Sequence, residues 1–129
     1  SLSPPDVRAA ALAVQARVLI SKGGKRNMRK ADRLLVKAVR VKKTSSDALI
    51  AKAILQEKRG KRSEAKAVYR DLISRMERAD EAHYRLGRLL MSNRLTRRDG
   101  VGLLRILVDA EGQSKWKARA RRLLPDRRR

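Results

Sequence analysis

Apolar residues recur every three or four positions along nearly the whole chain, which is the spacing of a helix that buries one side. Glycine or capping residues interrupt this pattern near residues 24, 44, 60, 80, 93 and 112. The pattern therefore predicts seven helices. In the first of them the recurring apolar positions are Val7, Ala10, Ala11, Val14, Val18 and Leu19.

Several predicted helices begin with serine or threonine, which are residue types favoured at the N-cap position. Ser3, followed by Pro4 and then Asp6, is predicted as a short capping box. Thr96 with Asp99 is predicted as a second one. A cap for the third helix is predicted in the stretch 44–46, and Ser114 is predicted to cap the last helix. Pro125 is predicted to end that last helix.

The segment 46–78 is repeated 34 residues later. In the first copy the aligned positions are Leu49, Ala53, Gly60, Ala65, Tyr69 and Leu72, and in the second they are His83, Gly87, Arg94, Asp99, Leu103 and Ile106. One inserted residue improves the second half of the second copy, where it aligns Gly100, Leu104 and Leu107 instead. Small residues such as Ala53 and Gly87 recur where two helices must touch. This period is typical of a solenoid built from paired helices.

These positions resemble the tetratricopeptide repeat family. The second repeat carries Leu49, Ala53, Gly60, Ala65 and Tyr69, the third carries Leu86, Gly87 and Leu90, and the first carries Leu12, Ala16, Leu19, Ala31, Leu35 and Ala38. Trp116, Ala120 and Leu123 look like the capping helix of such an array, although the closing proline of each repeat is missing. The resemblance implies an all-α, right-handed superhelix of antiparallel helix pairs. About three repeats and a C-terminal capping helix would form one domain over residues 1–124, cut from a longer protein, with a basic tail at 125–129. A generic helical repeat of similar period is the alternative.

The chain is strongly basic, with a formal net charge of +22 over 129 residues. The cations gather mainly between residues 22 and 43 and again from residue 115 onward. Such a surface is either a solvated face that reflects composition alone or a binding site for an acidic peptide, a nucleic acid or an anionic membrane surface. There is no cysteine and no apolar run of membrane-spanning length.

The resemblance also implies a concave groove lined by the first helix of each pair. The residues carried onto this groove are Arg17, Ile20, Ile50, Ile54, Lys58, Tyr84, Arg85, Arg88, Met91, Lys117 and Arg121. The groove would be an apolar strip flanked by cations. Some family members hold a partner's terminal carboxylate with a clamp of lysine, asparagine and arginine on these helices. Here Asn27 and Asn93 fall at turns, which disfavours that ligand class.

Catalysis has little support in the sequence. His83 is the only histidine, there is no cysteine, and Gly23–Gly24 is a helix stop rather than a phosphate-binding loop. We therefore expect no enzymatic activity and no cofactor or metal, and we expect His83 to be structural. The preferred hypothesis is a soluble, cytoplasmic protein–protein adaptor whose basic groove binds an acidic or amphipathic protein segment. The alternative is nucleic-acid binding through the basic surface, which the scarcity of aromatic residues disfavours.

Overall fold

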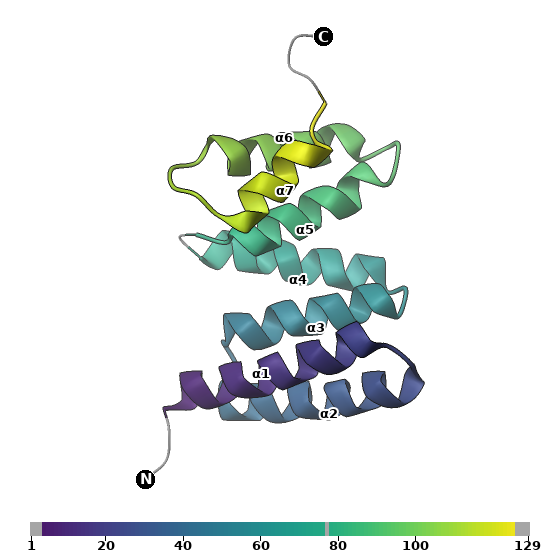
Figure 1. Cartoon of the computed structure of the whole chain (residues 1–129), viewed down its shortest axis with the longest axis vertical. Helices are drawn as coiled ribbons and strands as arrows, with labels where there is room; N and C mark the ends of the chain where they lie inside the picture. Colours follow the sequence, from purple (N-terminus) through teal and green to yellow (C-terminus); the bar gives the residue numbers. More distant parts are fainter. Residues whose placement is uncertain (1–3, 77, 126–129) are drawn as a thin grey trace. The chain divides into compact units, whose positions relative to one another are not determined.

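The structure is a computed structural model that describes residues 4–76 and 78–125. These residues form helices and no strands, so the all-α class and the prediction of seven helices are confirmed (Figure 1). The helices are α1 (Pro5–Lys22), α2 (Lys25–Val41), α3 (Ser46–Lys58), α4 (Arg62–Arg75), α5 (Asp80–Met91), α6 (Arg97–Asp109) and α7 (Lys115–Leu123). None of them is long and apolar enough to cross a lipid bilayer. The predicted cap Ser3 and residues 126–129 of the predicted tail lie outside the described residues.

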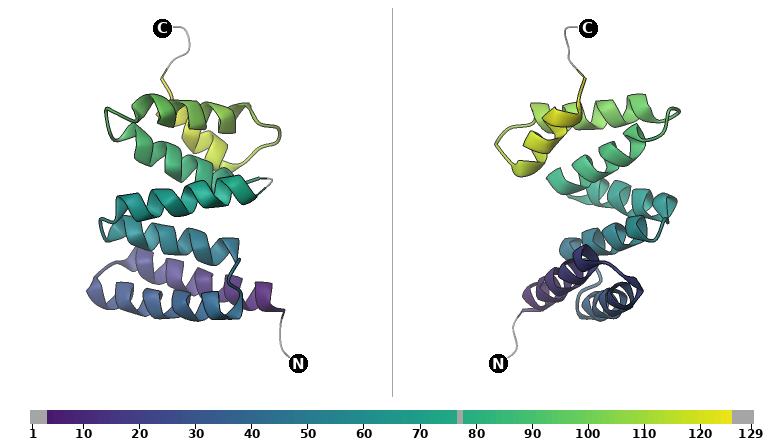
Figure 2. Two further views of the ribbon diagram at one scale, coloured as in Figure 1. Left: turned by 180° about the vertical axis from the view of Figure 1, so that it is seen from behind. Right: turned by 45° about the vertical axis from the view of Figure 1, so that its right-hand side comes forward.

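The chain divides into two compact units, Ser1–Val68 and Tyr69–Arg129, with the boundary inside α4. In the first unit α1 and α2 form an antiparallel pair, seen side by side in Figures 1 and 2. Gly23 and Gly24 join them with φ angles of 77° and 89°, a left-handed conformation that favours glycine. Helix α3 packs against both α1 and α2.

Helix α1 buries a different face from the one that its valines predict. Its buried residues are Ala9, Ala13, Ala16 and Ile20. Val7, Val14 and Val18 are instead 55%, 61% and 49% exposed. The recurring positions Val7, Val14 and Val18 therefore mark an exposed face of α1 rather than its buried one. The periodicity could not choose the face because α1 is apolar on both sides.

The core of the molecule is rich in alanine, which makes up half of the buried apolar residues that the structure describes. In the first unit the buried alanines are Ala9, Ala13, Ala16, Ala31, Ala38, Ala48, Ala51, Ala53 and Ala65. Because the alanine side chain is only a methyl group, the facing backbones can approach closely. The contacts between helices therefore depend on small side chains.

In the second unit α5 and α6 pair through glycine, and α7 packs against both helices. A Cβ atom added at Gly87 would lie 2.6 Å from the Leu104 side chain, which confirms Gly87 as a point of close helix contact. Gly100, Leu104 and Leu107 are the buried residues of α6, whereas Ile106 is 61% exposed. The buried positions of α6 thus agree with the version of the repeat alignment that contains one inserted residue and not with the version without it.

Two of the predicted caps form, and one does not. Ser45 and Ser114 accept hydrogen bonds from the backbone N–H groups of Ala48 and Lys117 at 3.3 and 3.2 Å. Thr96 makes no cap hydrogen bond, so the predicted capping box with Asp99 is wrong. Its hydroxyl instead donates to the Leu90 carbonyl at 2.7 Å, which ties the connection to the end of α5.

Candidate binding surface on α5 and α7

Aromatic and cationic side chains from α5 and α7 converge on the ring of Trp116. The Tyr84 and Trp116 ring centroids are 5.6 Å apart with a tilt of 37°. The Trp116 centroid also lies 5.4 Å from Cζ of Arg85, 4.9 Å from Nζ of Lys115 and 4.8 Å from Cζ of Arg119. We call these five residues the Trp116 cluster. All three cations lie within the range at which the π-electron density of an indole ring attracts a positive charge.

Helical spacing explains part of this arrangement, because Trp116 and Arg119 are three residues apart on α7 and so lie on one face. Tyr84 and Arg85 reach the ring because α7 packs against α5. Arg85 is further held by Glu81, whose Oε2 accepts from its Nε at 2.8 Å between two largely buried side chains. The Arg85 guanidinium is therefore fixed before any ligand arrives.

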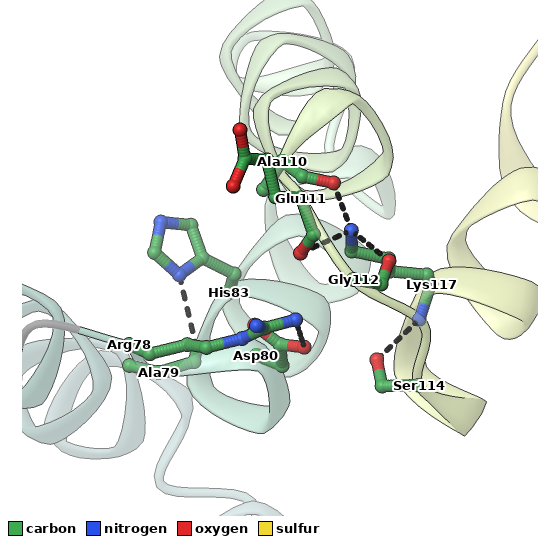
Figure 3. Close-up of polar contacts among 9 residues, drawn as sticks. All are labelled: Arg78, Ala79, Asp80, His83, Ala110, Glu111, Gly112, Ser114 and Lys117. Carbon is green, nitrogen blue, oxygen red and sulfur yellow. Dashed lines mark hydrogen bonds and ion pairs between the residues drawn. The ribbon is translucent and has the colours of Figure 1, made fainter.

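Lys117 holds the start of α7 in place and is itself buried, with 1% of its surface exposed. Its ammonium donates hydrogen bonds to the carbonyls of Ala110, Glu111 and Gly112 in the connection from α6 (Figure 3). These carbonyls follow the end of α6, so a cation beside them also complements the negative end of the helix dipole. The expectation that Lys117 is a groove cation is corrected by this geometry: its charge is used inside the fold.

A neighbouring ion pair lies at the start of α5. Nε and one terminal nitrogen of Arg78 each lie 3.2 Å from an Asp80 carboxylate oxygen. Burial opposes ionisation of Asp80, but hydrogen bonds from Arg78 and Ser114 and the charges of Arg78 and Lys117 outweigh it. The pKa of Asp80 therefore lies below its ordinary value of 3.8.

His83 lies beside this region and faces the backbone. Its Nδ1 is 3.0 Å from the Ala79 carbonyl oxygen one turn earlier, and its side chain is half-buried (Figure 3). This contact agrees with a structural role for the ring. Within the described part of the chain, no three His, Cys, Asp or Glu residues are grouped closely enough to hold a metal ion.

The structure brings together only part of the predicted groove in the second unit. Tyr84 and Arg85 belong to the Trp116 cluster, and Arg88 lies exposed near Arg85 along α5. Met91 is half-buried and packs against the core of this unit. Arg121 is exposed on α7 but is not part of the cluster.

In the first unit the predicted groove residues offer little open apolar surface. Ile50 and Ile54 on α3 are only 9% and 8% exposed. Arg17 is half-buried and Lys58 is exposed. Ile20, also expected on the groove, is a core residue of α1. An open apolar strip is therefore not present on α3.

The sequence pattern does not identify Trp116, Lys115 and Arg119 as site residues, because it places Trp116 only on the capping helix. The signal that could have found part of this set is the spacing of Trp116 and Arg119, which are three residues apart on one helix. Contact with Tyr84 and Arg85 depends on how α7 packs on α5, and the repeat period does not specify this contact.

No protein-family model matches the chain, and comparisons with curated proteins and with solved structures find no match. The resemblance to tetratricopeptide repeats therefore stays a prediction.

Proposed function

We propose that this chain is a non-enzymatic protein-binding module whose basic surface takes acidic protein segments. The proposal includes the right-handed superhelix of paired helices that the resemblance implies. The observation that carries it is the Trp116 cluster, in which two half-buried aromatic rings that pack on the core of the second unit lie beside three cations.

The chemistry of the cluster suits an acidic segment that contains an apolar residue. Tyrosine, tryptophan and arginine are the residues that most often dominate the energy of protein interfaces. The rings can contact an apolar side chain, and Arg119, which is exposed, can take a carboxylate through two parallel hydrogen bonds. Lys115 and Arg119 carry like charges beside one ring, and a bound carboxylate would relieve the repulsion between them.

The experiment uses Trp116 as its own reporter, because it is the only tryptophan in the chain. A short peptide of Glu, Asp and Leu is titrated into the full chain while the Trp116 fluorescence is recorded. We expect a saturable change that weakens as salt is added, because exposed charges are screened within about 8 Å at physiological ionic strength.

Paired charge reversals locate the site. Lys115→Glu with Arg119→Glu should weaken binding far more than Arg97→Glu with Arg98→Glu, which makes the same change in net charge on exposed residues of α6. Circular dichroism verifies that both variants stay helical. Equal losses of affinity in the two variants would mean that the peptide responds to net charge alone and not to the Trp116 cluster. That result would contradict the proposal.

Nucleic-acid binding is the second candidate, and one observation favours it. Tyr84 and Trp116 lie together beside cations, and single-stranded nucleic acids bind by stacking bases on aromatic rings next to such charges. An oligouridine titration with the same fluorescence readout tests it. Each phosphate contact should add about 0.7 to the slope of log affinity against log salt concentration for a single strand. An affinity for oligouridine that does not change with salt would exclude this candidate.

The same titrations compare the two candidates. Oligouridine that binds more tightly than the peptide at moderate salt would overturn the peptide proposal.

A further inference from the structure

Two shallow hollows lie along the seam between α1 and α2 in the first unit. One has a volume of about 360 Å³ and the other about 310 Å³, and Lys37 lines both. Because they share Lys37, the two hollows are neighbours along this seam, and we treat them together as one surface. Its apolar floor consists of Leu12, Leu19, Leu34 and Val41. We call this surface the α1–α2 groove.

The apolar surface continues from the groove onto α1. Ala11 lines one of the hollows, and Val7, Val14 and Val18 share its side of the helix at spacings of four, three and seven residues. These three valines are about half exposed or more. The apolar face of α1 that the structure leaves uncovered thus adjoins the floor of the groove.

The rim of the groove is cationic. Arg8, Lys30, Arg33 and Lys37 line the two hollows, and no carboxylate does. The Nε atom of Arg8 is buried and has no hydrogen-bond partner. A buried donor without an acceptor costs free energy, so the chain leaves this guanidinium incompletely satisfied.

The shape of the groove suits a helix. Two packed helices leave a furrow between them into which the side chains of a third helix can fit, and α3 already packs against both α1 and α2. A second copy of this chain would bring a net charge of +22 against a cationic rim, which like-charge repulsion opposes. The occupant must therefore combine an apolar stripe with negative charge.

We propose that the α1–α2 groove is a docking site for an acidic amphipathic helix of a partner protein. The apolar side of that helix covers Leu19, Leu34 and the valines of α1, and its carboxylates meet the cations of the rim. This site goes beyond the proposed function, since it is a separate surface that does not use the Trp116 cluster.

Two dye-labelled synthetic peptides test the proposal by fluorescence anisotropy with the full chain. One is an amphipathic helix with leucine at spacings of three and four residues and glutamate elsewhere, and the other has the same composition with the leucines scattered. We expect the amphipathic peptide to bind at least about tenfold more tightly, because only it can bury its leucines together. Equal affinities would mean attraction by charge alone and would overturn the proposal.

A matched pair of charge reversals then places the peptide. Lys37→Glu should weaken binding of the amphipathic peptide by about tenfold, because an attractive contact becomes a repulsive one. Lys52→Glu, an exposed lysine of α3 outside the groove, makes the same change in net charge and should have a much smaller effect. Equal effects would contradict a site in the groove.

Nuclear magnetic resonance separates this inference from the proposed function. When the amphipathic peptide is added, we expect the chemical shifts of the methyl groups of Ala11, Leu19 and Leu34 to change. Shifts confined to the Trp116 indole would overturn the groove while leaving the proposed function standing. Sedimentation of the chain alone supplies a further check: self-association that Lys37→Glu changes would show that the occupant is a second copy, which overturns the proposal.

Discussion

Lys117 shows that a charged residue on a basic chain can be part of the core. Its stem is buried and its ammonium satisfies three backbone carbonyls of the connection between α6 and α7. Lys117→Met keeps the stem and removes these hydrogen bonds, and should lower the free energy of unfolding by about 1–3 kcal/mol. Urea denaturation followed by circular dichroism measures the loss. Lys52→Met removes an exposed ammonium and should change stability by less than about 0.5 kcal/mol, so equal losses would contradict the structural role of Lys117.

Asp80 gives the second prediction at this scale. Because the pKa of Asp80 is lower in the folded chain than its ordinary value of 3.8, its carboxylate contributes stability above that value. This contribution is lost as the pH falls through the lowered pKa. The stability difference between the chain and Asp80→Asn should therefore shrink between about pH 5 and pH 2. Urea denaturation across this range measures it, and a constant difference would show that the ion pair with Arg78 does not act through ionisation.

At the scale of elements, the contact between α5 and α6 depends on Gly100. A Cβ atom there would lie 2.7 Å from the Gly87 carbonyl oxygen and 2.8 Å from the Met91 backbone nitrogen, so the backbones would have to separate. Gly100→Ala should destabilise the chain by roughly 1–3 kcal/mol. Gly102→Ala on the same helix meets nothing within 4 Å and should stabilise by up to about 1 kcal/mol, because alanine is the better helix former. Thermal melts of the two variants that coincide would refute the close contact.

The helices themselves could be predicted from the sequence, because glycine, serine and threonine mark their ends and apolar residues recur within them. The buried face of α1 could not, since alanines and valines occupy opposite sides and both are apolar. Only part of the Trp116 cluster could be predicted. The resemblance places Tyr84 and Arg85 at a binding surface, whereas their contact with Trp116 depends on how α7 packs on α5. Lys117 was misassigned because burial of an ammonium depends on carbonyls contributed by a connection, which no helical period encodes.

At the scale of the whole molecule, the charge of +22 should oppose folding, because like charges lie closer together in the folded chain than in the unfolded one. Added salt screens this repulsion. The melting temperature should rise between about 50 and 500 mM NaCl, over which the screening length falls from more than 10 Å to less than 5 Å. Circular dichroism melts measure the shift, with sucrose at equal osmolality as the uncharged control. A melting temperature that does not change with salt would show that the cations are already compensated in the fold.

The alanine-rich core has a consequence for how this protein responds to temperature. A buried alanine withdraws less apolar surface from water than a buried leucine or phenylalanine, and the heat capacity change of unfolding scales with that surface. The chain should therefore have a smaller heat capacity change than is usual for its length. A smaller change flattens the curve of stability against temperature, so cooling should weaken this protein less than one with an aromatic core. An alanine-rich core thus lowers the maximum free energy of unfolding and widens the temperature range over which that free energy changes little.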